Sequence, residues 1–184
     1  MGKVVLFTGG SRSGKSVCAE TYVAALDRSV VYVATAATAD DEMRERVARH
    51  RARRPAEWQT LEAEVRVAAR LGSVANGSAV LLDALSMLAS NVLLGEENDP
   101  ELVLRDEVAA LLQATHERDL TLVVVTDEVG MGIVPAYPLG RRYRDLLGQA
   151  NQQVAVVASE VYLVIAGIAV DLRRLEAVFA RRPV

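Results

Sequence analysis

Several residue types that restrict a fold are scarce in this chain. Its 184 residues include one cysteine, Cys18, one tryptophan and two phenylalanines. A single cysteine excludes an intrachain disulfide and is compatible with a reducing compartment. With so little phenylalanine, the core must be built mainly from valine, leucine and alanine. No apolar run approaches the length of a membrane span, and the apolar start is too short for a signal peptide, so we predict a soluble cytoplasmic protein.

The chain also lacks a strong charge of either sign. Its net charge of -3 offers no broad attraction to nucleic acid or to an anionic membrane, so we predict a small-molecule partner and no nucleic-acid partner. Lysine is almost absent, because arginine supplies nearly all the cations and only Lys3 and Lys15 are lysines. The compact ammonium of Lys15 stands at a position where phosphate chemistry uses it.

Short β-branched runs alternate with longer amphipathic segments from one end of the chain to the other. This alternation predicts an α/β fold with a mostly parallel sheet, helices on both faces and a single domain over residues 1–184. We predict strands at 3–8, 30–34, 79–83, 120–126 and 161–165, and helices at 14–26, 40–51, 62–71, 85–94, 100–117 and 139–159. In such a sheet, chemistry gathers beyond the carboxyl ends of the strands.

The segment 9–16 fits the pattern G-x-x-x-x-G-K-[ST] in full and directly follows an apolar run. Its glycines let backbone N–H groups point at phosphate oxygens, and the following helix aims its positive end at the same place. Lys15 supplies a charge for the outer phosphates, and Ser16 offers a hydroxyl to Mg²⁺. The alternative is a plain turn between strand and helix. We predict a P-loop NTPase-like fold that binds a nucleoside triphosphate through Gly9, Gly10, Ser11, Arg12, Ser13, Gly14, Lys15 and Ser16.

An arginine-rich segment surrounds a histidine after the second predicted strand. Arg46 precedes His50 by one helical turn, and Arg51, Arg53 and Arg54 follow it. So many cations disfavour the imidazolium form and therefore favour a neutral, nucleophilic imidazole. Such a group suits attack on phosphorus, with guanidinium groups stabilising the charge that develops. Three other interpretations stay open: a solvated basic helix face, a packed structural histidine, and a phosphate-binding patch without covalent chemistry.

Carboxylates follow two of the predicted strands. Asp83 ends the third strand, where P-loop enzymes hold Mg²⁺ directly or through water, although it could instead cap the next helix. Asp127 and Glu128 follow the fourth strand and are candidates for positioning an acceptor hydroxyl, or else exposed loop acids. The next loop, 130–135, has apolar side chains between flexible glycines and could cover a bulky substrate. Glu62 is expected to be a surface residue at a helix start.

The pattern R-x-x-x-H-R-x-x-R-P-x-x-W-x-T-x-E, which runs from Arg46 to Glu62, resembles the signature of a known enzyme family. The family is that of the bifunctional adenosylcobinamide kinases and adenosylcobinamide-phosphate guanylyltransferases of cobalamin biosynthesis. The strings T-G-G-x-R-S-G-K-S at 8–16, G-E-x-N-D at 95–99 and E-V-G-M-G-I-V-P at 128–135 resemble the family too, in the same order. The resemblance extends over nearly the whole chain.

The resemblance implies that His50 is the residue that becomes guanylylated. It also implies a homotrimer. One departure stands out, because the chain has Asp127 where the family pattern has asparagine before Glu-Val-Gly. Beyond the P-loop, the nucleotide contacts that the family implies fall on Ala34, Thr35, Ala36, Arg51, Ala52, Arg53, Arg54, Glu62 and Asp83.

The motifs, together with this resemblance, imply an enzyme with two successive activities, of which the first uses Mg²⁺. First, the γ-phosphoryl group of ATP or GTP passes to the aminopropanol hydroxyl of adenosylcobinamide, a corrinoid. Second, His50 attacks the α-phosphorus of GTP, pyrophosphate leaves, and the guanylyl group moves to adenosylcobinamide phosphate to give adenosylcobinamide-GDP. One alternative is a P-loop kinase for another small alcohol without a covalent histidine. Another is a nucleotide-dependent switch or binding protein in which the loop at 130–138 reorders for a protein partner.

Overall fold

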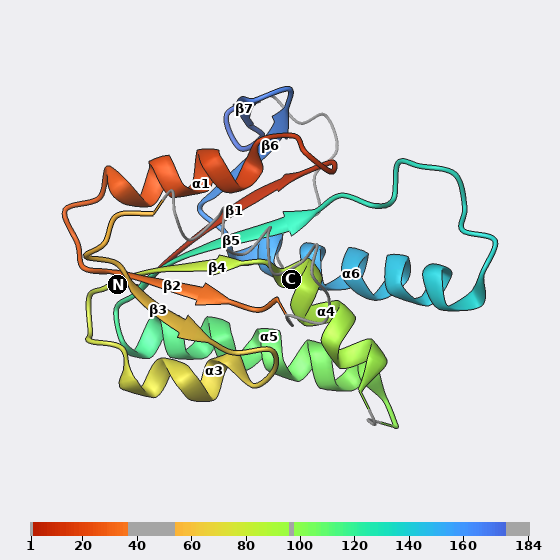
Figure 1. Ribbon diagram of the computed structural model, residues 1–184, viewed down its shortest axis with the longest axis horizontal. Helices are drawn as coiled ribbons and strands as arrows, with labels where there is room; N and C mark the ends of the chain where they lie inside the picture. The colour runs from red at the N-terminus through yellow and green to blue at the C-terminus, as the bar shows by residue number, and fades with distance from the viewer. Residues whose placement is uncertain (1, 37–53, 96–97, 176–184) are drawn as a thin grey trace.

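A computed structural model describes residues 2–36, 54–95 and 98–175 of the chain (Figure 1). Strands and helices alternate along the sequence, as predicted. The strands are β1 (Lys3–Gly9), β2 (Val30–Ala34), β3 (Gln59–Glu62), β4 (Ala79–Asp83), β5 (Thr121–Asp127), β6 (Glu160–Ile165) and β7 (Ile168–Asp171). The helices are α1 (Lys15–Ala24), α3 (Val67–Arg70), the 3₁₀ helix η1 (Leu71–Ser73), α4 (Leu85–Leu94), α5 (Pro100–Glu117) and α6 (Pro138–Val157).

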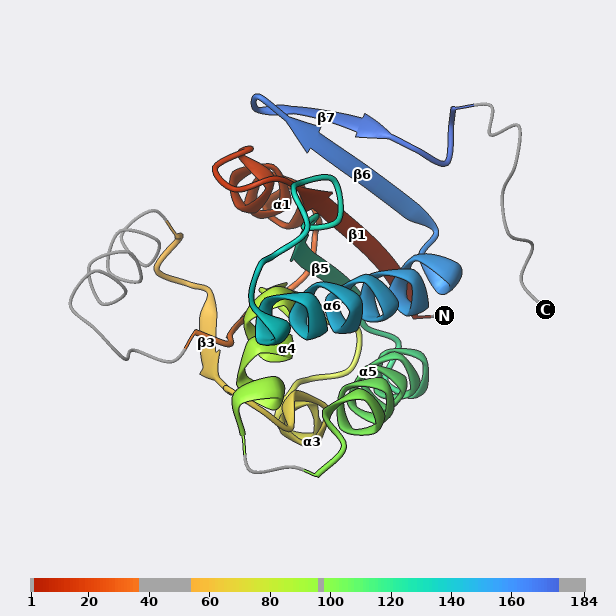
Figure 2. The same ribbon diagram turned by 90° about the vertical axis from the view of Figure 1, so that its right-hand side faces the viewer.

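The strands form one seven-stranded sheet in the order β3-β2-β4-β5-β1-β6-β7. Neighbouring strands are parallel throughout, except that β6 and β7 are antiparallel. The predicted P-loop NTPase-like fold with a mostly parallel sheet is therefore confirmed. Figure 2 looks toward the edge at which the parallel strands end, beside the start of α1. We call this edge the carboxyl edge of the sheet.

Alternate residues of each central strand enter two separate cores. Val4 and Leu6 of β1 belong to one core, and Val5 and Phe7 belong to the other. The first core lies under the helices α3 to α6, whereas α1 covers the opposite face with Ala19 and Val23. Because both faces are covered, the strands read as continuous apolar runs, which is why the sequence revealed them.

The structure departs from the sequence prediction at two edges of the sheet. Residues 59–62 form the edge strand β3, whereas the helix predicted for 62–71 is reduced to α3 and η1. The last strand, β7, was not predicted either; it follows the turn at Ala166 and Gly167, both of which have positive φ. Both strands are four residues long and mostly exposed, so tertiary pairing rather than an apolar run defines them. The helix predicted for 40–51 lies outside the described residues.

The first turns of α5 and α6 contain residues that are common at helix N-termini. The carboxylate of Asp99 accepts the N–H of Leu102 at 3.0 Å, and Pro100 occupies the first turn of α5. Proline is also found at the start of α6. Both features are common at helix N-termini, because the first N–H groups have no partner within the helix. Within the described ranges, no helix is both long and apolar enough to cross a bilayer.

Candidate functional site

The loop between β1 and α1 is a tight turn that leads directly into the start of α1. Gly14 is the N-cap residue of α1 and has φ 95° and ψ 3°, a left-handed conformation that favours glycine. Within the loop, the N–H of Ser13 donates to the carbonyl of Gly10 at 3.2 Å. Because Gly14 has no side chain, the first N–H groups of α1 are not capped by it. This arrangement suits an anion at the helix N-terminus.

The turn between β6 and β7 packs directly against the same loop. The N–H of Gly167 donates to the carbonyl of Ser13 at 2.7 Å. A Cβ atom at Gly14 would lie 3.1 Å from the Cα of Gly167, so the two backbones approach closely. The unpredicted hairpin therefore supports the P-loop from outside.

The two glycines that open the P-loop differ sharply in the space around them. A Cβ atom at Gly9 would collide with the carbonyl of Val164 and lie 2.8 Å from Ser13 Oγ. A Cβ atom at Gly10 would meet no atom of the described residues within 4 Å. We expect Gly9→Ala to lower the free energy of unfolding by about 2 kcal/mol, the usual scale of overpacking. The matched Gly10→Ala variant should stay within about 0.5 kcal/mol of the natural protein. Urea denaturation measures both, and equal losses would contradict the crowding at Gly9.

Asp83 lies at the end of β4 and faces the P-loop. Its Oδ1 accepts a hydrogen bond from Ser16 Oγ at 3.3 Å, and its Oδ2 accepts one from the Tyr32 hydroxyl at 2.8 Å. Burial, together with the negative charge of Asp83, raises the pKa of Tyr32, so this hydroxyl stays protonated and remains a donor. The N-cap residue of α4 is Ala84, with no side-chain cap, so the geometry does not support Asp83 as the helix cap.

Arg54 lies over the ring of Tyr32, with its guanidinium carbon 3.4 Å from the ring centroid. The stacking is a cation–π contact on a tyrosine that itself bonds to Asp83. One end of the arginine-rich segment is thus brought to the same edge of the sheet as the P-loop. The other predicted residues of that segment, His50, Arg51, Ala52 and Arg53, lie outside the described residues.

The last residues of β2 and β3 lie at the same edge. Ala34 pairs with Asp83 on one side and with Glu62 on the other. Glu62 is therefore the last residue of a strand rather than the start of a helix, which corrects the sequence expectation. Its position at the carboxyl edge follows from the pairing of β3 with β2.

Thr35 joins the end of β2 to the start of α4. Its buried hydroxyl accepts from the N–H of Ala84 and donates to the carbonyl of Ala84, both at 2.8 Å. Asn91 Nδ2 donates to the carbonyl of Thr35 at 2.8 Å. Thr35 thus helps to position the backbone at Ala84, next to the start of α4. The predicted contacts of Thr35 and Ala36 with nucleotide stay predictions.

Lys15 points to the carboxylate that ends β5. Its Nζ lies 2.5 Å from Asp127 Oδ1 and donates to the carbonyl of Gly10 at 3.2 Å. The second oxygen of Asp127 accepts from Ser86 Oγ at 2.6 Å. The two residues that the motif assigns to phosphate and metal, Lys15 and Ser16, therefore face two different carboxylates.

Sequence reasoning missed the residues that hold Asp127 in place. Ser86 is buried in α4, and its carbonyl accepts from the hydroxyl of Tyr143, whose pKa burial raises to about 12, with the charge of Asp127 adding to the shift. Asn151 of α6 accepts from Thr126 at 2.6 Å and donates to the carbonyl of Asp127 at 3.1 Å. A polar residue on the apolar face of a predicted helix was the available signal, because buried polar groups need partners.

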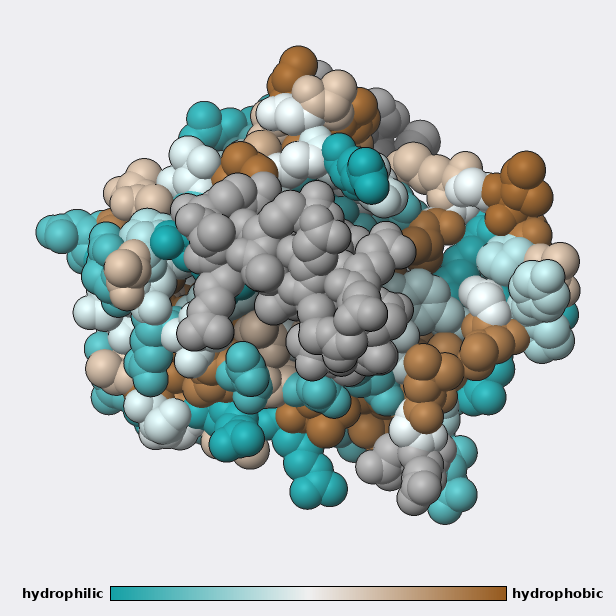
Figure 3. Space-filling model, viewed as in Figure 1, coloured by the Kyte–Doolittle hydropathy of each residue, from teal (hydrophilic) through white to brown (hydrophobic). Residues whose placement is uncertain are grey.

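The loop between β5 and α6 carries large apolar side chains that face outward. Met131 is 81% exposed and Ile133 is 96% exposed. Apolar residues at the right-hand edge of Figure 3 lie where Figure 1 places this loop. The base of the loop is held by α6, since Arg144 donates to the carbonyl of Gly130 at 2.8 Å and Arg141 donates to the carbonyl of Pro135 at 2.9 Å.

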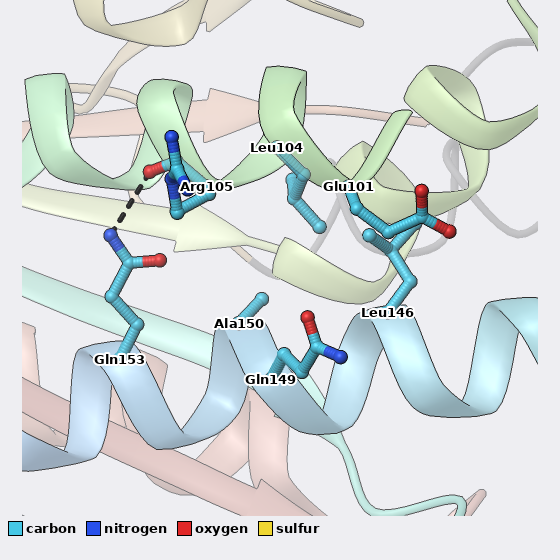
Figure 4. A pocket seen from close by; sticks show the side chains of 7 residues that line it. All are labelled: Glu101, Leu104, Arg105, Leu146, Gln149, Ala150 and Gln153. Atoms are coloured by element: carbon cyan, nitrogen blue, oxygen red, sulfur yellow. Dashed lines mark hydrogen bonds between the residues drawn. The ribbon is translucent and has the colours of Figure 1, made fainter. Parts of the chain in front are cut away.

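A cavity of about 410 Å³ lies between α5 and α6, and its lining does not include the P-loop residues (Figure 4). Gln153 Nε2 bridges its walls by donating to the carbonyl of Arg105 at 3.0 Å. This cavity belongs to the helical layer opposite α1, and among the described residues none that is predicted for nucleotide binding lines it. The candidate site is therefore the carboxyl edge of the sheet, around the P-loop.

Comparison with known proteins decides the family. A sequence model described as cobinamide kinase / cobinamide phosphate guanyltransferase matches residues 5–172, which include the P-loop, the arginine-rich segment and the loop after β5. The chain belongs to this family. The resemblance predicted from the motifs is thus confirmed, and the family match spans the whole described sheet except the first residues of β1.

Named relatives of this family match over nearly their full length. The bifunctional adenosylcobalamin biosynthesis protein CobU of Salmonella typhimurium is 39% identical over 181 residues, covering 92% of this chain and 99% of the relative. The protein of the same name from Escherichia coli is 38% identical over the same shares. The bifunctional adenosylcobalamin biosynthesis protein CobP of Pseudomonas aeruginosa is 41% identical, covering 91% of this chain and 96% of the relative. As a member of this family, the chain is an enzyme.

Proposed function

We propose that this chain phosphorylates the aminopropanol hydroxyl of adenosylcobinamide and then transfers GMP from GTP to the phosphate that it has made. The observation that carries the proposal is the P-loop at the carboxyl edge, where Lys15 and Ser16 face carboxylates from two neighbouring strands. The family match supports the choice of a corrinoid as acceptor.

In the kinase step, the chain's own groups bind and orient the triphosphate. Backbone N–H groups of the loop and of the start of α1 bind the phosphates, and Lys15 contacts the outer ones. The acceptor hydroxyl attacks the γ-phosphorus, the bond between this phosphorus and the oxygen that bridges to the β-phosphate breaks, and the nucleoside diphosphate leaves. The hydroxyl proton passes to water. Positioning and charge stabilisation account for most of the rate in such a transfer.

Ser16 and Asp83 are the residues that would hold Mg²⁺. They fit it, because both supply oxygen atoms and because Mg²⁺ is usually held by one or two protein oxygens together with phosphates and water. When bound, Mg²⁺ neutralises charge on the phosphate oxygens. Tyr32 keeps the second oxygen of Asp83 hydrogen-bonded and so orients the carboxylate.

In the guanylyl step, we assign the nucleophile to His50. Its imidazole nitrogen forms a bond to the α-phosphorus of GTP, and the bond to pyrophosphate breaks. An oxygen of adenosylcobinamide phosphate then attacks the same phosphorus and breaks the P–N bond, which returns the histidine. Arg54 stacks on Tyr32, which is the hydrogen-bond partner of Asp83, and we assign its guanidinium to stabilising charge on the phosphates.

The loop after β5 offers a surface for the acceptor. A corrinoid is a large ring with extensive apolar area, and the exposed side chains of Met131, Ile133 and Tyr137 lie beyond the strand that ends at Asp127. Burying such side chains against a substrate is favourable, whereas leaving them in water is not. We assign the loop 130–138 to covering the corrinoid.

Product analysis tests the whole proposal. The protein is incubated with adenosylcobinamide, Mg²⁺, ATP and GTP. The corrinoids are then separated and identified by mass spectrometry. We expect a phosphorylated corrinoid that is converted to its GDP derivative, with release of pyrophosphate. Phosphorylation without any GDP derivative would favour a plain P-loop kinase, and nucleotide turnover indifferent to the corrinoid would favour a switch. We also propose a cytoplasmic homotrimer, whose mass sedimentation measures directly.

A further inference from the structure

The ammonium of Lys15 already has a strong partner, and that partner is not phosphate. Lys15 Nζ lies 2.5 Å from Asp127 Oδ1, and the lysine side chain is only 9% exposed. An ammonium has three donors, of which one goes to Asp127 and one to the carbonyl of Gly10. The motif assigns the same ammonium to the outer phosphates of a nucleotide. Asp127 and a triphosphate therefore compete for one cation.

The carboxylate of Asp127 is held in place independently of Lys15. Ser86 Oγ donates to its second oxygen at 2.6 Å, and Asn151 donates to its backbone carbonyl at 3.1 Å. Asp127 also lies directly beside Gly9, its partner in the pairing of β5 with β1. Because Asp127 is short and braced whereas lysine has four flexible methylenes, Lys15 is the partner that moves.

The two carboxylates at the P-loop thus have separate partners. Asp83 bonds to Ser16, on the side that we assign to the metal. Asp127 bonds to Lys15, whose ammonium compensates the charge of the carboxylate. When Lys15 turns to a phosphate, the carboxylate of Asp127 is left close to another anion, and like charges at short distance repel.

We propose that Asp127 competes with nucleotide phosphate for the ammonium of Lys15, so that it weakens the hold of the P-loop on the triphosphate and on the nucleotide product. This inference rests on the proposed binding of nucleotide at the P-loop. It assigns Asp127 as a positioning residue for Lys15 that tunes nucleotide affinity. Asparagine at this position would keep the hydrogen bond from Ser86, because an amide oxygen also accepts, but would lose the charge.

Calorimetry with Mg²⁺ and a non-hydrolysable β,γ-imido nucleotide tests the exchange. We expect Asp127→Asn to bind this nucleotide about tenfold more tightly than the natural protein. The control is Asp106→Asn, which makes the same charge change on the exposed surface of α5 and should leave the affinity unchanged. Binding to the natural protein with equal or weaker binding to Asp127→Asn overturns the inference alone. No binding to the natural protein would contradict the proposed nucleotide site as well.

The scarcity of lysine allows a direct view of the exchange. With ¹⁵N-labelled lysine the protein has only two side-chain ammonium signals, from Lys3 and Lys15. Lys3 pairs with Glu160 at the other end of β1 and serves as an internal control. We expect the β,γ-imido nucleotide to shift the Lys15 signal of the natural protein, and Asp127→Asn to shift it without nucleotide, while the Lys3 signal stays in place. If the Lys15 signal does not shift on adding the nucleotide, or does not shift in Asp127→Asn, the inference is overturned.

Discussion

His50→Ala is expected to abolish transfer of label from GTP to the protein while the kinase step persists. GTP carries the label in its α-phosphate, so only a bond between the protein and the α-phosphorus retains it after pyrophosphate leaves. A phosphoramidate is labile in acid and stable in alkali, and this stability identifies the linkage. The loss should be complete, because removing the nucleophile removes the bond itself.

The chain provides its own control, since its other histidine is His116. His116 lies in the last turn of α5, where a cation is favoured by the helix dipole, far along the chain from the P-loop. His116→Ala should take up as much label from GTP as the natural protein does. A natural protein that binds GTP and yet takes up no label would contradict the two-activity proposal and favour a plain kinase.

Lys15→Ala should slow phosphorylation of the corrinoid by about 100-fold or more, the scale seen when one preorganised charge is removed from a transition state. The outer phosphates lose their ammonium contact, so the charge on them in the transition state is no longer stabilised by Lys15. Phosphate transfer from ATP, followed by mass spectrometry of the corrinoid, measures the rate.

Lys3→Ala is the matched control for Lys15→Ala. It removes the other lysine, whose partner is Glu160 at the opposite end of β1. The rate of phosphorylation should stay near that of the natural protein. The melting temperature of both variants shows whether they are folded, and full transfer by a folded Lys15→Ala variant would rule out the role given to that lysine.

Much of the site could be read from local patterns. The P-loop is a contiguous string, so its geometry follows from neighbouring residues, and Gly14 takes the left-handed conformation that this turn requires. Asp83 could be expected at the carboxyl edge because a continuous apolar run precedes it. The role of His50 rests on the motif alone, since that residue lies outside the described ranges.

Other parts of the site depend on pairings that no local pattern contains. Glu62 was expected on a helix, but the pairing of β3 with β2 brings it beside Ala34. The contact between Gly167 and Ser13 joins residues that are distant in the sequence. Ser86 and Asn151 were not predicted as functional residues, because nothing in their own helices shows which carboxylate they meet.

The sequence by itself determined the P-loop, the α/β alternation and the family, because each is written in contiguous residues or in apolar periodicity. Only the tertiary structure decided which carboxylate meets which P-loop side chain. That choice follows from the strand order, in which β5 lies between β4 and β1. As a result, Asp127 forms an ion pair with Lys15, and Asp83 accepts a hydrogen bond from Ser16. Strand order arises from packing between distant segments, and so a motif cannot contain it.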